Sequence, residues 1–371
     1  MKKFQNLTLL IIFVLIYLFG YTQNDNNKYQ EFALFVAGKE FPKSIDSTIS
    51  KTFWENYKQN LENDWTEIDT ARLQIMKQWQ ENEISPKIID SLSVFYPFSG
   101  PDFLHVYSLF PKSNNYLMLA QEHLGKIPDL SKMKEAELKT YLDKFYFSIR
   151  DIFQRSYFIT MRMTSDLYND KIQGVLPLLL FFLAQTNHTI INVEYQKLQT
   201  NNNFVEFTGN PSGRFSSGEC VFIQFFDNQN DKTTKTLRYF RCDLSDSGLQ
   251  NATIFKNFVT KYSENCITYT KSASYLMHNE TFSVIRKIVL DNSSVVFQDD
   301  TGVPYKYFDS NIWTKYLYGT YVRPIADFGA YLTQSDLKQA YELGNDVYPL
   351  PFSLGYHWRD GNQNQMMFIK N

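Results

Sequence analysis

The stretch from Ser93 to Gln121, SVFYPFSGPDFLHVYSLFPKSNNYLMLAQ, decides the fold of this chain. An apolar run typical of a strand at 93–96 leads through Pro-Phe-Ser-Gly-Pro-Asp into a helix-like run at 100–110, and a second apolar run follows at 116–121. This order predicts a βαβ unit, in which the two strands are parallel and the crossover is right-handed.

The pattern recurs later in the chain. Residues 266–270 read as a strand, 280–290 as a helix and 294–298 as a strand. The first unit ends in Gln121-Glu122-His123 and the second in Gln298-Asp299-Asp300. The acidic residues that end both units suggest duplicated halves, and they place candidate site residues after two strands.

The remaining segments complete an α/β pattern. Helical spacing is found at 47–83, 138–152, 249–262 and 335–343, and also at 167–184, where Pro177 lies near a helix start or a kink. Strand patterns are found in TIINVEY, FVEFTG, the 220–242 hairpin, LPFSLGYHW and MMFIK. We expect an α/β fold with a mixed, mostly parallel sheet and flanking helices. It contains two βαβ units, an antiparallel hairpin and an N-terminal helical segment.

The expected organisation has three parts. Residues 1–22 form a signal peptide, 23–90 an N-terminal helical segment and 91–371 an α/β domain. That domain divides, if at all, into βαβ-containing halves near 91–188 and 189–371.

The N-terminus has the pattern of an export signal. Lys2 and Lys3 precede a 13-residue apolar run, Leu7–Phe19, and small residues then permit cleavage before Gln23. The run is shorter than the about 20 apolar residues of a membrane span. Thr22 occupies the last position before the cleavage site, where Ala is usual. An uncleaved N-terminal anchor is therefore the alternative.

The run Val175–Ala184, VLPLLLFFLA, has only ten residues and is interpreted as a buried core element. We therefore expect an exported protein of the periplasm or cell surface that is soluble after cleavage and has no further transmembrane segment.

Composition excludes one class of partner. The formal net charge is −2, so the chain lacks the basic character typical of nucleic-acid binding. Aromatic residues reach 17%. Sugar stacking would use them, but AT-rich codon usage and ordinary core packing are the simpler explanation.

Two of the three cysteines flank the predicted hairpin. If its turn centres on Asp231, then Cys220 and Cys242 face each other across the ladder and can form a disulfide. The alternative is that both are small buried hydrophobes, and Cys266 stays free in either case.

The loop PFSGPD, 97–102, has three interpretations. A dinucleotide or methyl-donor site fits Glu122 as a ribose contact, but the loop has one glycine rather than three, and Pro101 removes a backbone donor. A nucleophile elbow at Ser99 is disfavoured by Pro97 and Pro101 on either side. A helix start is favoured, with Ser99 or Gly100 as cap, Pro101 at the first helical position and Asp102 in the first turn. We expect no cofactor.

Chemistry is expected beyond the carboxyl ends of the strands. Candidate catalytic residues are His278, Asp299, Asp300 and Lys271, and candidate ligand-binding residues are Ser99, Asp102, Glu122, His123 and Ser274. Each also has a structural interpretation: an Asx turn at 299–302, a helix cap at His278 and a solvated Lys271. No HExxH, HxH or CxxC motif occurs, so no metal site is predicted.

The strings FYPFSGPDFL, YFIT, GVLPLLLFFLA, SASYLMH, QDDTGVPYKYF and GYHW together resemble an uncharacterised family of bacterial proteins, many of them exported. The resemblance spans roughly residues 95–358 and implies no reaction. It marks SASYLMH and QDDTGVP as characteristic segments. The three cysteines are not part of that pattern.

Two functional classes remain. The favoured one is an exported non-catalytic protein that binds a small ligand or an envelope partner. The alternative is an exported hydrolase that uses carboxylate and histidine. The two are discriminated by geometry, because the hydrolase needs His278 within hydrogen-bond reach of Asp299 or Asp300 in a concave pocket.

Export has a direct test. N-terminal sequencing of the protein from its own host is expected to find Gln23 or a close neighbour first, because the signal is removed on export. Recovery of intact Met1 from the cytoplasmic fraction would contradict the prediction.

Overall fold

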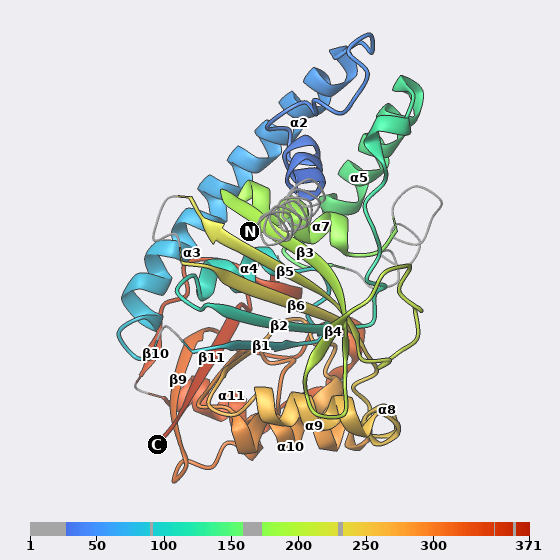
Figure 1. Cartoon of the computed structure of the whole chain (residues 1–371). Helices are drawn as coiled ribbons and strands as arrows, with labels where there is room; N and C mark the ends of the chain where they lie inside the picture. The colour runs from blue at the N-terminus through green and yellow to red at the C-terminus, as the bar shows by residue number, and fades with distance from the viewer. Residues whose placement is uncertain (1–26, 90–91, 159–172, 229–232, 345, 359–360) are drawn as a thin grey trace, which may run out of the picture.

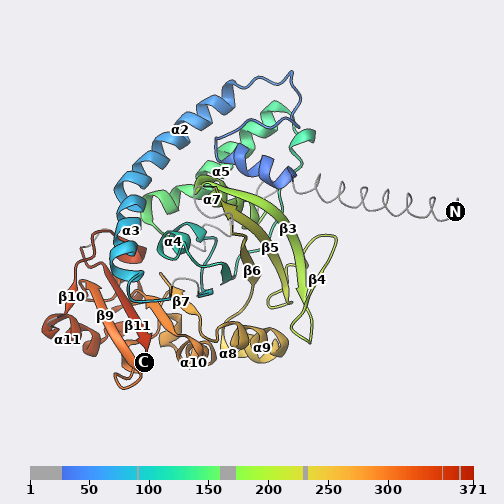
Figure 2. The same cartoon turned by 60° about the vertical axis from the view of Figure 1, so that its left-hand side comes forward.

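A computed structural model of the chain describes residues 27–89, 92–158, 173–228, 233–344, 346–358 and 361–371. The predicted signal peptide, 1–22, and the first part of the helix predicted at 167–184, residues 167–172, lie outside the described residues. One large sheet crosses the molecule, and helices cover both of its faces (Figures 1 and 2).

The sheet has eleven strands within the described residues. From one edge to the other these are β10 (Val347–Tyr348), β9 (Trp313–Gly319), β11 (Asn364–Lys370), β8 (Val295–Gln298), β7 (Ile267–Thr270), β1 (Val94–Pro97), β2 (Asn115–Ala120), β6 (Lys235–Arg241), β5 (Glu219–Asp227), β3 (His188–Leu198) and β4 (Phe204–Glu206).

The central five strands, β8-β7-β1-β2-β6, are all parallel. Antiparallel strands extend the sheet on both sides, with β11 beside β8 and β5 beside β6. The mixed α/β architecture with two parallel βαβ units confirms the predicted fold class.

One face of the sheet is covered by five helices, whose buried residues share one core. They are α2 (Thr52–Ile68), α3 (Gln74–Trp79), α4 (Phe103–Leu109), α5 (Glu135–Arg155) and α7 (Leu176–Gln185). Two π-helical turns, 69–73 and 80–84, continue α2 and α3, so the predicted helix at 47–83 exists with two widened turns. Residues 176–184 of α7 are all buried, which confirms that this apolar run is core.

The opposite face is covered by shorter helices: α8 (Asp246–Asn251), α9 (Thr253–Tyr262), α10 (Ser283–Asn292) and α11 (Ser335–Leu343). Successive side chains of β1 point to opposite faces of the sheet, so each face has its own core. Val94 and Tyr96 join the core on the α7 side, and Phe95 joins the core on the α10 side.

The predicted halves share this one sheet, since β1 of the first lies beside β7 of the second. The N-terminal segment also packs into it. Trp79 of α3 contacts the rings of Phe297, Tyr318 and Phe352 at centroid distances of 6.1, 4.9 and 5.2 Å.

The disulfide prediction is wrong. Cys220 lies opposite Phe240, not Cys242, because the hairpin register centres one residue earlier than Asp231. Both cysteines, and Cys266, are buried free thiols. They are therefore the small buried hydrophobes of the alternative interpretation.

Two local expectations also need correction. The segment LPFSLGYHW is not a strand but contains a 3-10 turn, Gly355–His357. Gly355 has φ +70°, and a Cβ there would lie 2.7 Å from Asp299 Oδ2, so the backbone turns where only glycine fits. Strands β9 and β10 were not predicted at all.

The core role of α7 can be measured. Phe181 is fully buried among the rings of Trp65, Phe145 and Phe182. Phe181→Ala should lower the free energy of unfolding by about 3–5 kcal/mol, because it removes this packing and leaves a cavity. The control Phe147→Ala, at a side chain that is 51% exposed, should change it by less than about 0.5 kcal/mol. Equal effects in urea titrations would contradict this role.

Candidate functional site

The two βαβ units diverge from a single point in the sheet. β1 connects through α4 to β2 on one side, and β7 connects through α10 to β8 on the other, while β1 and β7 lie side by side. The two helices cover opposite faces. Such a switch point leaves a crevice beyond the carboxyl ends of the strands, where open α/β sheets bind ligands.

A cavity of about 430 Å³ lies at this point, and we call it the switch-point cavity. Its walls come from the loops after β1 and β7, the end of α5 and two later turns. The lining residues are Tyr96, Phe98, Ser99, Gly100, Asp102, Arg155, Tyr157, Phe158, Lys271, Ser272, Ser274, Asp327, Phe328 and Tyr356. The loops 97–102 and 271–278 therefore line one common crevice.

The loops around the cavity hold strained backbone. Phe98, Ser272, Ser274 and Tyr275 have φ values of 59°, 54°, 53° and 55°. The left-handed region is costly for residues with a Cβ, and a bulky phenylalanine or tyrosine there is unusual. Strain of this kind persists where the surrounding structure over-determines it, and it concentrates at functional sites.

A buried ion pair forms the floor of the cavity. Lys271, the first residue after β7, places Nζ 2.6 Å from Oδ2 of Asp102, and both side chains are at most 3% exposed. Nζ also donates to the carbonyl oxygen of Ser156, which ends α5. The pair thus ties β7 to the start of α4 and to α5.

Asp102 also caps α4. Its Oδ1 accepts from the backbone N–H of His105 at 3.3 Å, so the helix starts at Phe103, two residues later than Pro101. Asp102 is therefore the cap in place of Ser99 or Gly100, and Pro101 precedes the cap instead of opening the helix. The Tyr96 hydroxyl donates to Oδ2 at 3.3 Å.

Electrostatics fix the charge states of this cluster. Burial alone would raise the pKa of Asp102, but His105 and Lys271 outweigh it and hold the pKa below its ordinary range. Burial lowers the pKa of His105 to about 4, so its imidazole is neutral at pH 7 and donates Nδ1–H to Oδ1 of Asp102 at 2.8 Å. Burial also lowers the pKa of Lys271, and Asp102 opposes that shift. The floor is therefore charged but internally neutralised.

The predicted acidic pair after β8 lies behind the cavity wall. Oδ2 of Asp299 accepts from the backbone N–H of Ser272 at 2.9 Å, and Oδ1 accepts from the backbone N–H of Thr301 at 3.0 Å. Burial, followed by repulsion from Asp300, raises the pKa of Asp299 to about 6. Asp299 thus shapes the loop after β7 and does not line the cavity.

Asp300 points elsewhere. Its carboxylate accepts from the hydroxyl of Tyr275 at 2.6 Å and from Nδ2 of Asn364 at 3.0 Å, and it lies 3.2 Å from Nε2 of His357. No hydrogen bond between the His278 ring and either carboxylate occurs among the described residues. Instead, His278 lines a second cavity, and burial lowers its pKa to about 4.

The other candidates separate into two groups. Ser99 and Ser274 line the switch-point cavity together with Asp102 and Lys271. Glu122 and His123 do not: Glu122 is buried with its Oε2 3.3 Å from the hydroxyl of Tyr239, and the ring of His123 lies beside Gly213.

Aromatic side chains make the walls, and sequence reasoning missed them. Tyr356 contacts the rings of Tyr157 and Phe328 at 4.9 and 5.1 Å, and its hydroxyl lies 2.7 Å from Oγ of Ser274. The string GYHW contained Tyr356, but only the fold brings it to the end of α5. Arg155, His105 and Phe328 had no distinguishing signal.

Comparison with known proteins adds no relationship. No protein-family model, no curated protein sequence and no solved structure matches the chain significantly. The resemblance drawn from its strings therefore stays a prediction. Within the described residues, no group of three or more His, Cys, Asp or Glu side chains is placed to hold a metal ion, and no helix is long and apolar enough to cross a membrane.

The buried pair can be tested by a double-mutant cycle. Lys271→Met should lower the free energy of unfolding by about 3–5 kcal/mol, because it strands the Asp102 carboxylate without its partner. Asp102→Asn should cost a similar amount. The double variant should recover most of the loss, since no uncompensated charge remains. Additive losses in urea titrations would show that the two groups do not act as a pair.

Proposed function

We propose that this protein binds a small organic ligand in the switch-point cavity. One observation carries the proposal. The cavity lies at the carboxyl edge between β1 and β7, and left-handed residues of both loops, Phe98, Ser272 and Ser274, line it. A volume of about 430 Å³ is in the range of small-molecule sites.

The lining suits binding through ring contacts and a few polar groups. Tyr157, Phe328 and Tyr356 supply flat apolar faces, and Ser274 and Arg155 supply polar atoms near them. Aromatic walls combined with placed polar groups are typical of ligand pockets.

The ionisable groups on the floor support binding rather than catalysis. Lys271 is buried and engaged by Asp102 and Ser156, and Oγ of Ser99 lies 2.9 Å from the carbonyl oxygen of Gly100. An activated nucleophile needs a base within hydrogen-bond reach, and the hydroxyl of Ser99 faces carbonyl oxygens instead.

The hydrolase alternative loses its main support. It required His278 together with Asp299 or Asp300, and both carboxylates are engaged by other partners. We therefore favour the non-catalytic interpretation.

We further propose that the protein acts outside the cytoplasm, in the periplasm or at the cell surface of a bacterium. Lys2, Lys3 and the apolar run Leu7–Phe19 support export, and the net charge of −2 gives no support for a nucleic-acid partner.

The proposal predicts ligand-dependent stabilisation. In a thermal-shift screen of small organic compounds, covering amino acids, nucleosides, sugars and aromatic acids, at least one compound should raise the Tm saturably. A ligand at one hundred times its Kd stabilises the folded state by about 2.7 kcal/mol. Tyr356→Ala should abolish the shift because it removes a cavity wall.

The matched control is Tyr146→Ala. Tyr146 is a half-buried tyrosine on α5 that contacts Tyr57 of α2 and lines neither cavity. Its removal should leave the shift intact. The proposal is wrong if no compound stabilises the native protein, or if Tyr356→Ala responds as the native protein does.

A further inference from the structure

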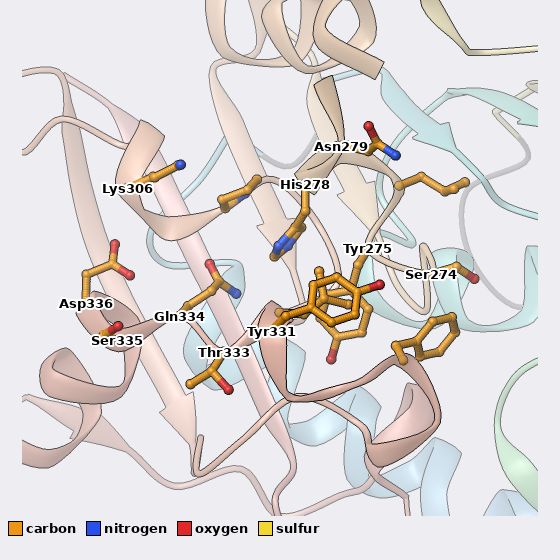
Figure 3. A pocket seen from close by; sticks show the side chains of 14 residues that line it. Ser274, Tyr275, His278, Asn279, Lys306, Tyr331, Thr333, Gln334, Ser335 and Asp336 are labelled. Carbon is orange, nitrogen blue, oxygen red and sulfur yellow. The ribbon is translucent and has the colours of Figure 1, made fainter. Parts of the chain in front are cut away.

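A second cavity of about 550 Å³ adjoins the first. Ser274 and Phe328 line both cavities, so these two residues form a shared boundary. Figure 3 shows the second cavity extending from Ser274 at one end to Lys306 and Asp336 at the other. The two cavities therefore lie next to each other, with Ser274 and Phe328 between them.

The second cavity presents a tyrosine face to solvent. Tyr331 is 86% exposed, the highest value among the exposed large hydrophobic residues of the described chain. It lies on a 3-10 turn, Ala330–Leu332, that follows the turn Ala326–Phe328 directly after Gly329. Gly329 has φ +92°, a conformation that other residues rarely adopt, so the chain can place Phe328 at the boundary and Tyr331 over the second cavity.

Uncharged polar groups also line this cavity. Thr333 and Ser335 contribute hydroxyls, and Asn279 contributes an amide whose Oδ1 accepts from the N–H of Thr281 at 3.2 Å. His278 also lines this cavity, and Figure 3 shows its ring near Tyr331, while its Nε2 is buried.

Charged lining residues of the two signs are equal in number in both cavities. Lys306 and Asp336 line the second cavity, and Arg155, Lys271, Asp102 and Asp327 line the first, where Lys271 and Asp102 form an ion pair. A ligand with a large net charge would lose hydration on entry and would meet no net opposite charge in the lining. The double cavity therefore suits a neutral ligand with many hydroxyl groups.

We propose that the two cavities form one cleft that binds a neutral oligosaccharide, with one end between Tyr157, Tyr356 and Phe328 and the other over Tyr331. The negative face of an aromatic ring attracts the polarised C–H face of a sugar, and hydroxyl and amide side chains hydrogen-bond its edge. This inference rests on the proposed function and names the ligand class for the same site.

An extended peptide fits less well. Two frequent modes of peptide binding add a strand to an exposed sheet edge or place an apolar helix face in an apolar groove. The edge strands of this sheet are β4 and β10, whereas the cleft is bounded by loops and 3-10 turns around the central strands. The hydroxyls and amides of the second cavity also suit a sugar better than an apolar helix.

The test uses isothermal titration of the mature protein with neutral oligosaccharides of two to six units. The series are cellulose, chitin, xylan, α-1,4-glucan and β-1,3-glucan fragments. At least one series should bind, and its affinity should rise with length until the chain spans both cavities. Tyr331→Ala should weaken binding of the six-unit ligand about three- to tenfold, the range expected for one aromatic contact, and leave the two-unit ligand unchanged.

Two controls make the outcomes distinct. Phe147→Ala removes an exposed aromatic residue that lines neither cavity and should change no affinity. Tyr356→Ala should weaken ligands of every length. The inference is overturned if no neutral series binds, if only acidic oligosaccharides or peptides bind, or if affinity is independent of length and of Tyr331. In those cases, a small compound that stabilises the native protein but not Tyr356→Ala would still support the proposed function. If no such compound is found, the proposed function and this inference are both overturned.

Discussion

The buried contact between Lys271 and Asp102 is the constraint on which the rest of the site depends. It joins the first residue after β7 to the cap of α4, and it reaches α5 through the carbonyl oxygen of Ser156. Three segments far apart in the sequence are thus held at one point. Two charges can remain in such a buried place only while each has its partner, because an unpaired charge in the interior is very costly. The geometry of the floor is therefore coupled to the positions of α4 and α5 on the sheet.

A buried pair of this kind is weak evidence for stability, since well-packed apolar residues often serve as well or better. Its position is more informative than its energy. It lies between the two strands from which the βαβ units diverge, and the loops on either side of it adopt left-handed conformations at Phe98 and Ser272. Local strain and buried charge occur together at this edge, and neither improves folding by itself, so their coincidence supports the proposal of a functional site here.

The sequence predicted the part of this site that depends on parallel strands. The segments 93–96 and 266–270 were interpreted as strands that lead into helices. If two such strands pair in parallel, their carboxyl ends lie at the same edge of the sheet. That pairing places Ser99, Asp102, Lys271 and Ser274 near one another. The aromatic walls could not be found in the same way. Tyr356 and Phe328 reach the cavity only because turns at Gly355 and Gly329 redirect the chain, and apolar periodicity does not report such turns. The disulfide failed for a related reason, since a shift of one residue in the turn centre changes every partner in a hairpin.

Charge neutralisation within the floor also limits what the cavity can recognise. Because Asp102 is already satisfied by Lys271, His105 and Tyr96, the floor has little capacity to pair with a charged group from a ligand. In the proposed function, discrimination would then come from shape, ring contacts and polar groups along the walls, among them Arg155 and Asp327. A buried charge without a partner is costly, so the neutralised floor disfavours a charged ligand group placed directly on it. The ion pair that joins β7 to α4 and α5 would in this way also restrict the ligand groups that the proposed site accepts at its floor.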